Sequence, residues 1–220
     1  KTFYPSATTS LTSGKNVVAV PAYFDGLALF INTDLIGDTV PSTWSDLQTS
    51  AAKVATVDPK TGSVNIGGVA LGTADNVDHF SDILSLMMLQ NGVSDLKSIN
   101  TSIAGDGRNL GQDALTFYAE FVQGADKVWD ESMPPSTTAF ATGRLGYYFG
   151  PSWRILEFRN PQSQLKFKVV PAPQLSGGSV NWASFWAWGV SSKSPNTAAA
   201  CEFVKYLSGA DVQKKIFAEE

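Results

Sequence analysis

The run LALFI at residues 27–31 constrains the fold most, because it is entirely apolar and shows no alternation with polar residues. Such a strand is covered on both faces, as in a parallel or mixed sheet flanked by helices. Helical patterns, with apolar residues three and four apart, follow Pro41, Asp78, Gly107 and Pro195, and short apolar strands separate them. Strands that alternate with helices in this way predict an α/β fold.

Local signals predict several element boundaries. Residues 17–20 read as a buried strand that Pro21 stops, so residues 21–26 would form a connection before the strand at 27–31. Asp78 is a candidate cap for the helix that follows it, and Ser194-Pro195 has the form of a cap with proline at the first helical position. Gly150-Pro151 is expected to break the strand at residues 145–149.

Composition excludes several classes of function. Of the 220 residues, 43% are hydrophobic, which is enough for a substantial core. The net charge of −4 and the lack of a basic stripe disfavour a nucleic-acid partner. No run near 18 consecutive apolar residues predicts a membrane span. Cys201 and His79 are each the only residue of their type, so neither an intrachain disulfide nor a Cys₄ or Cys₂His₂ metal site is expected.

Four segments stand out as candidate sites: three combine aromatic and hydrogen-bonding residues, and residues 72–79 form a polar loop before a helix. They are residues 21–26, 72–79, 149–153 and 181–188. Each has a plain structural alternative: a turn, a solvated loop, or core packing. No dinucleotide fingerprint, phosphate-binding loop, or zinc or serine hydrolase motif is present, so no cofactor or metal is expected.

The segment 181–188 departs furthest from ordinary packing, since it holds three Trp and one Phe. If it is extended, Trp182, Ser184, Trp186 and Trp188 share one face. Aromatic faces beside carboxylate and amide groups suit a sugar, whose C–H faces stack while its hydroxyls are held by polar side chains.

Residues 14–21, 26–36 and 41–47 together resemble the extracellular solute-binding proteins of ABC importers, in the maltose-binding-like branch. The resemblance continues in the same order through residues 139–147, 150–153, 170–173, 188–190, 194–196 and 202–207. It covers nearly the whole chain.

The resemblance implies a periplasmic-binding-protein type II fold, with two lobes of mixed sheets flanked by helices and joined by crossing strands. Residues 1–24 would belong to the N-terminal lobe, 25–172 to the C-terminal lobe, and 173–220 would return to the N-terminal lobe. Proteins of this family have a further portion of the first lobe before the position of Lys1, and closing helices after the position of Glu220. A signal or lipoprotein peptide precedes that portion, so an extracytoplasmic location, in the periplasm or at the cell surface, is expected.

The same resemblance places the ligand contacts. Asp25 takes the position of an acidic residue that accepts sugar hydroxyls, and Trp153 takes that of a stacking Trp. The expected ligand-binding residues are Tyr23, Asp25, Asn76, His79, Trp153, Trp182, Ser184 and Trp186. They are expected to converge on one cleft between the lobes.

The function expected from these features is non-catalytic capture of a mono- or oligosaccharide, as a monomer, for delivery to the membrane subunits of an ABC importer. A carbohydrate-active enzyme such as a glycoside hydrolase stays open as an alternative, although no motif offers a second carboxylate to pair with Asp25. A binder of the same fold for a peptide, polyol or metal chelate also stays open, because fold does not determine the ligand.

Overall fold

The computed structural model describes residues 3–124, 126–160, 163–175 and 178–218. The chain divides into two compact units: a smaller one of Lys1–Asp25 with Ala183–Glu220, and a larger one of Gly26–Trp182. The second boundary lies later than the expected residue 173, because residues near it bond to the larger unit. Gln90 donates to the carbonyls of Pro173 and Val180, both at 3.0 Å. That these units are the two lobes of the family stays a prediction.

The larger unit is built on a mixed sheet. Its strands are β3 (Val20–Asn32, which begins in the smaller unit), β4 (Thr56–Val57), β5 (Val64–Val69), β6 (Leu145–Pro151) and β7 (Phe167–Pro171). The strand order is β4-β5-β6-β3-β7, in which β5 and β6 are parallel and the other neighbours are antiparallel.

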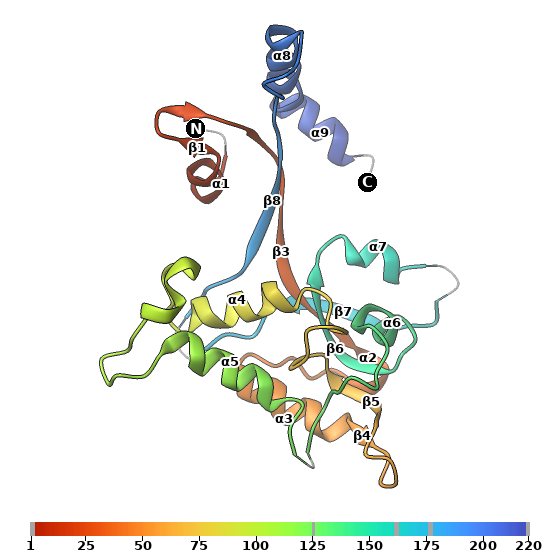
Figure 1. The fold of residues 1–220 in the computed structure, drawn as a ribbon. Coiled ribbons are helices and arrows are strands. Elements are labelled where there is room, and N and C mark those ends of the chain that lie inside the picture. The colour runs from red at the N-terminus through yellow and green to blue at the C-terminus, as the bar shows by residue number, and fades with distance from the viewer. Residues whose placement is uncertain (1–2, 125, 161–162, 176–177, 219–220) are drawn as a thin grey trace. The chain divides into compact units, whose positions relative to one another are not determined.

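Helices accompany this sheet throughout the larger unit. They are α2 (Thr33–Ile36), α3 (Trp44–Val54), α4 (Phe80–Gln90), the 3₁₀ helix η1 (Leu96–Thr101), α5 (Leu110–Glu120), α6 (Ser136–Ala141) and α7 (Arg154–Phe158). Helix α3 packs against β5 and α6 against β6, while α4 and α5 run side by side (Figure 1). The expected α/β class with mixed sheets flanked by helices is confirmed.

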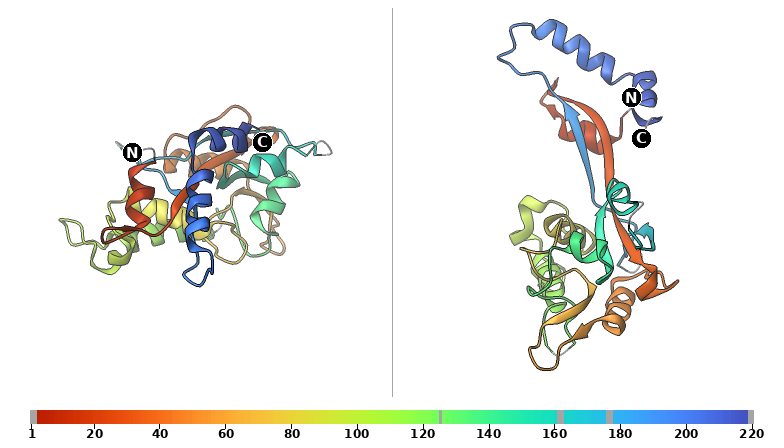
Figure 2. Two further views of the ribbon diagram at one scale, coloured as in Figure 1. Left: turned by 90° about the horizontal axis from the view of Figure 1, so that it is seen from above. Right: turned by 90° about the vertical axis from the view of Figure 1, so that its right-hand side faces the viewer.

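The smaller unit contains the N- and C-terminal elements of the chain. These are α1 (Pro5–Ser10), the hairpin of β1 (Thr12–Ser13) and β2 (Asn16–Val17), the start of β3, β8 (Ala183–Trp188), α8 (Thr197–Leu207) and α9 (Ala210–Ala218). Strand β8 pairs with β3, and Figure 2 shows β3 as one continuous strand with β8 beside it.

Strand β3 corrects the expectation of two strands separated by a connection at residues 21–26. Val17 and Val18 are 67% and 58% exposed, so residues 17–20 are not a buried strand. Pro21 does not end a strand but lies inside β3. A strand tolerates proline at a position whose N–H is not needed for the hydrogen bonds of the sheet. Asp25 therefore sits on an extended strand rather than in a turn.

Two helix starts also differ from the expectation. Asp78 does not cap α4: the cap position belongs to His79, and the Asp78 carboxylate instead accepts from Ser136 Oγ at 3.1 Å and from the backbone N–H of Thr137 at 3.0 Å. Helix α8 begins at Thr197 rather than at Pro195, with Asn196 as its cap residue. The first difference arises because distant residues of α6 take the Asp78 carboxylate.

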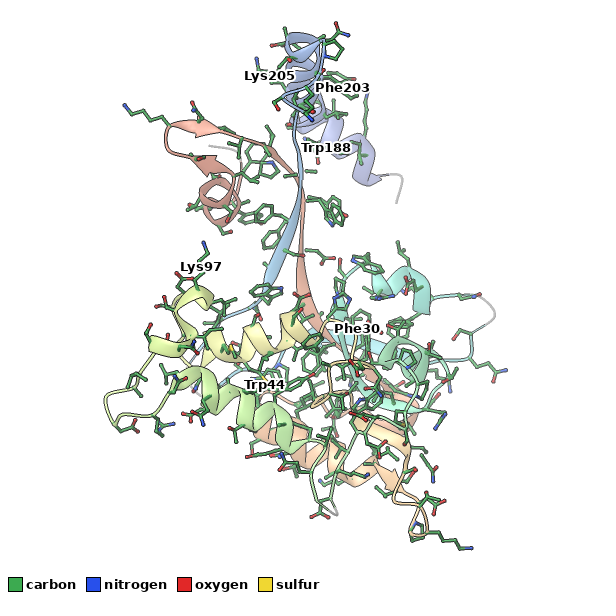
Figure 3. All side chains as sticks on the ribbon, in the orientation of Figure 1. Phe30, Trp44, Lys97, Trp188, Phe203 and Lys205 are labelled. Atoms are coloured by element: carbon green, nitrogen blue, oxygen red, sulfur yellow. The ribbon has the colours of Figure 1, made fainter. Side chains whose placement is uncertain are left out.

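The hydrophobic core lies in the larger unit. Phe30, near the C-terminal end of β3, has no exposed surface and packs among four aromatic rings at centroid distances of 5.6 to 6.2 Å (Figure 3). Among the described side chains of the smaller unit, only Ala7 is buried. The apolar residues of α8 therefore have no core to enter, and Phe203 is 60% exposed.

No helix in the described part of the chain is both long enough and apolar enough to cross a membrane.

Candidate functional site

The eight expected ligand-binding residues divide evenly between the two units. Tyr23, Asp25, Ser184 and Trp186 belong to the smaller unit, and Asn76, His79, Trp153 and Trp182 belong to the larger one. Their convergence on one cleft stays a prediction. Each half of the set has its own internal geometry.

Trp153 is one of the four expected site residues of the larger unit. It lies where β6 ends and α7 begins, as the cap residue of α7, and 42% of its surface is exposed. The guanidinium carbon of Arg154 stands 4.4 Å from the ring centroid, and the His79 ring lies 6.5 Å away, tilted by 74°. The structure thus brings Trp153 and His79 together and adds a cation.

His79 has an unusual backbone conformation. With φ 61° and ψ 22° it is left-handed, and it is the only non-glycine residue with positive φ in the described chain. Its Nδ1 lies 3.3 Å from the Asp82 carboxylate. An ionised carboxylate only accepts, so Nδ1 carries the proton of this bond, and Nε2 of a neutral ring is then an acceptor. Nε2 is buried and has no hydrogen-bond partner.

Arg154 is a residue that the sequence analysis did not select. Its Nη1 pairs with Glu157 at 2.5 Å, while its Nε is buried without a hydrogen-bond partner. Burial lowers the pKa of Arg154, but the bond to Glu157 and nearby negative charges outweigh it and raise the pKa, so the side chain is a permanent cation. The only signal in the sequence was its position next to Trp153.

Asp78 anchors the loop that carries His79 to α6. Its carboxylate accepts from both Oγ1 and the backbone N–H of Thr137, and Thr137 Oγ1 also meets Tyr148 Oη at 3.1 Å. Burial raises the pKa of Asp78, but the bonds from Thr137 and Ser136 outweigh it, and the pKa lies below its usual value. Asp78 is thus a structural carboxylate that is held ionised.

Asn76 has a fully engaged side chain. Its Oδ1 accepts from Thr73 Oγ1 at 2.5 Å and from Trp129 Nε1 at 3.1 Å. Its Nδ2 donates to the carbonyls of Asp130 and Met133, both at 3.0 Å. A ligand could reach this amide only at the expense of one of these bonds, which favours a structural role over the expected direct contact.

Trp182 packs against the core of the larger unit rather than lying on a face of β8, which begins one residue later. Its carbonyl accepts from the backbone N–H of Leu27 at 3.1 Å, whereas its indole Nε1 is buried without a hydrogen-bond partner.

In the smaller unit, the rings of Tyr23 and Trp186 stack at 6.3 Å with 29° between their planes. Together with Ala22, Ala187 and Trp188 they line a hollow of about 140 Å³. Exposure alternates along β8, with Ser184, Trp186 and Trp188 on the more exposed face, as the pattern of the segment predicted. The unit therefore offers a stacked aromatic surface next to the half-buried Asp25.

A separate apolar hollow of about 200 Å³ lies in the larger unit, lined by Trp44, Met87, Phe117 and neighbouring residues of α3, α4 and α5. No motif in the sequence points to this hollow.

Comparisons with known proteins agree on one family. The family model described as bacterial extracellular solute-binding protein matches residues 1–219. The fold is similar to that of an ABC transporter solute-binding protein from Thermotoga lettingae bound with α-D-tagatose, at 24% identity and a TM-score of 0.72, covering 98% of this chain and 56% of that one.

Two further solved structures show the same similarity. The GacH receptor of Streptomyces glaucescens, solved unliganded and in complex with acarbose, has 26% identity and a TM-score of 0.70, covering 96% of this chain and 53% of its own. A solute-binding protein from Agrobacterium vitis with bound D-mannitol has 19% identity and a TM-score of 0.66, covering 99% and 53%. The chain therefore spans about half the length of these proteins.

Proposed function

Because this chain belongs to the family of bacterial extracellular solute-binding proteins, we propose that it forms part of a binding site for a mono- or oligosaccharide. One observation carries the proposal. In the described part of the chain, the buried side-chain polar atoms without a hydrogen-bond partner are His79 Nε2, Arg154 Nε and Trp182 Nε1, and all three lie at or next to expected site residues.

Unpaired buried polar atoms are rare and call for a specific explanation. Two of these three belong to side chains that touch the exposed Trp153 ring. An aromatic face with polar groups at its margin matches a sugar ring, whose C–H groups stack and whose hydroxyls can both donate and accept. A sugar hydroxyl, directly or through an ordered water, is the partner that we propose for His79 Nε2, whose ring meets the indole edge-on.

Asp25, Tyr23, Ser184 and Trp186 are proposed as the ligand contacts of the smaller unit. The stacked rings of Tyr23 and Trp186 supply a second aromatic surface, and Asp25 supplies an acceptor for hydroxyl groups. The protein would act as a monomer outside the cytoplasm and deliver its ligand to the membrane subunits of an ABC importer. Solved neighbours with α-D-tagatose and acarbose support a sugar.

A polyol is the second candidate, because one solved neighbour holds D-mannitol. A polyol offers hydroxyls but no ring for stacking, so the contribution of Trp153 separates the two ligands. An enzymatic role is not proposed, since capture for import needs no reacting carboxylate pair of the kind that glycoside hydrolysis uses.

The test is a thermal-shift screen of the full-length protein with maltose, α-D-tagatose, acarbose and D-mannitol, and with a tripeptide as a different class. A ligand that binds the native state raises the unfolding temperature in a concentration-dependent way. Calorimetric titration of Trp153→Ala with the best sugar should show a loss of roughly 2 kcal/mol, about thirtyfold in Kd, as for a buried aromatic contact.

His79→Ala should weaken binding of the same sugar less than Trp153→Ala does, because the His79 ring contacts the Trp153 indole edge-on. If no sugar raises the unfolding temperature, or if Trp153→Ala binds within about twofold of the parent, the proposed site is wrong. Release of cleavage products from acarbose or maltose would replace the proposal with the enzymatic one.

A further inference from the structure

Two side chains hold the ring of Trp153 from different sides. Arg154 stands over a face of the indole, with its guanidinium carbon 4.4 Å from the ring centroid. His79 meets the indole edge-on, at 6.5 Å and 74°. With one face covered, a ligand that stacks on Trp153 has only the opposite face available.

Each of these two side chains is tied to a carboxylate three residues further along the chain. His79 Nδ1 lies 3.3 Å from Asp82, and Arg154 Nη1 lies 2.5 Å from Glu157. Asp82 and Glu157 are in the first turns of α4 and α7, so each carboxylate is fixed by a helix rather than by a loop. Of the remaining side-chain nitrogens, His79 Nε2 and Arg154 Nε are buried without a hydrogen-bond partner.

The backbone of His79 adds a second constraint. A left-handed conformation is unfavourable for a residue with a Cβ, and it persists only where the surroundings enforce it. Here the conformation occurs at the residue whose ring meets both Trp153 and Asp82. The strain therefore coincides with the placement of this ring against Trp153.

We propose that Asp82 and Glu157 are positioning residues, which hold His79 and Arg154 against Trp153 and thereby keep one indole face ready for a stacked ligand. This inference rests on the proposed function, since it takes Trp153 as a ligand-contacting residue. A preorganised face spares the ligand the cost of immobilising a rotatable side chain, so the anchors act on affinity without touching the ligand.

The first arm of the test needs no ligand. The full-length protein is labelled with 5-fluorotryptophan, and the ¹⁹F resonance of Trp153 is assigned from its absence in Trp153→Phe. Asp82→Asn and Glu157→Gln keep the shape of each anchor and remove its charge. Each should shift or broaden the Trp153 resonance, because the indole loses a fixed neighbour.

Asp113→Asn is the matched control, because it breaks an ion pair of similar length in the same unit, 2.6 Å from Arg108, without a contact to Trp153. It should leave the Trp153 resonance unchanged. Glu157 is 46% exposed, so Glu157→Gln is expected to fold, and it carries the test even if Asp82→Asn does not.

The second arm measures affinity for the best sugar among maltose, α-D-tagatose and acarbose. Asp82→Asn and Glu157→Gln should each weaken binding by about two- to fivefold, the range of a surface ion pair. In a Trp153→Ala background the same changes should have almost no further effect, because the anchors act through the indole.

The two arms separate the failure of this inference from that of the proposed function. If the Trp153 resonance is unmoved in both anchor variants, or if their effects add fully to Trp153→Ala, the positioning role is wrong even though a sugar binds. If no sugar binds but the resonance moves as expected, the proposed function fails and the positioning of the indole stands.

Discussion

Replacing Asn76 by Ala should destabilise the protein strongly and leave its ligand affinity nearly unchanged. The Asn76 amide accepts from Thr73 and Trp129, and it donates to the carbonyls of Asp130 and Met133. A hydrogen bond contributes about 0.5–1.5 kcal/mol net, and a partly buried carbonyl left without a donor costs more.

The expected loss of stability is smaller than the summed contribution of the four hydrogen bonds. Trp129 Nε1 also donates to Thr73 Oγ1 at 3.1 Å, so these two groups keep each other as partners when Asn76 is gone. Of the two carbonyls to which Asn76 Nδ2 donates, that of Asp130 keeps a bond from the backbone N–H of Met133 at 3.2 Å, whereas that of Met133 loses the Asn76 donor. The free energy of unfolding should therefore fall by about 2–4 kcal/mol.

The assay is urea unfolding of the full-length protein followed by circular dichroism. Asn91→Ala is the matched control, because the Asn91 amide donates a single bond, to the Leu110 carbonyl at 2.8 Å. It should cost only about 1 kcal/mol. A loss for Asn76→Ala no larger than that for Asn91→Ala would refute the argument. Normal stability with lost sugar affinity would restore Asn76 as a direct ligand contact.

Two further changes test the packing and electrostatics of the larger unit. Gly68→Ala should cost about 1–3 kcal/mol or more in denaturant unfolding, because the added Cβ would lie 2.3 Å from the Ala51 carbonyl oxygen; an unchanged midpoint would mean that α3 does not approach β5 so closely. Thr137→Val removes the hydroxyl bond to Asp78. The pKa of Asp78 lies below its usual value of 3.8 in the folded protein. Asp78 therefore contributes stability that is present above pH 3.8 and is lost as the pH falls through the folded pKa. The stability difference between Thr137→Val and the parent should therefore narrow in urea unfolding series below pH 3.8, and a difference that stays constant from pH 6 to pH 3 would contradict this role of Asp78.

The sequence alone was sufficient for the class of fold and for most of its elements. Within residues 27–31 every side chain except the partly buried Ala28 is buried, so both faces of the strand are covered, as an apolar run without alternation requires. The helix after Pro41 starts where its Thr43 and Asp46 form a reciprocal cap. Such features depend on neighbours within a few residues, so that local propensity and periodicity determine them.

Tertiary structure decided what distant residues do to one another. Pro21 looked like the end of a strand, but pairing between β3 and β8 carries the chain through it. Asp78 looked like a helix cap, but Thr137, far along the chain, takes its carboxylate. The family pattern selected His79 and Trp153 as site residues, whereas the contact between them appeared only in three dimensions.

Arg154, Asp82 and Glu157 show the same limit most clearly. Each is an ordinary charged residue in the sequence, and its part at Trp153 depends on a ring orientation that no local pattern encodes. A side chain's hydrogen-bond partners are set by which elements the folded sheet and helices bring together. For this reason the sequence indicated which kinds of residues a sugar site would need, and only the packed structure determined which neighbours hold them and which buried polar atoms have no hydrogen-bond partner.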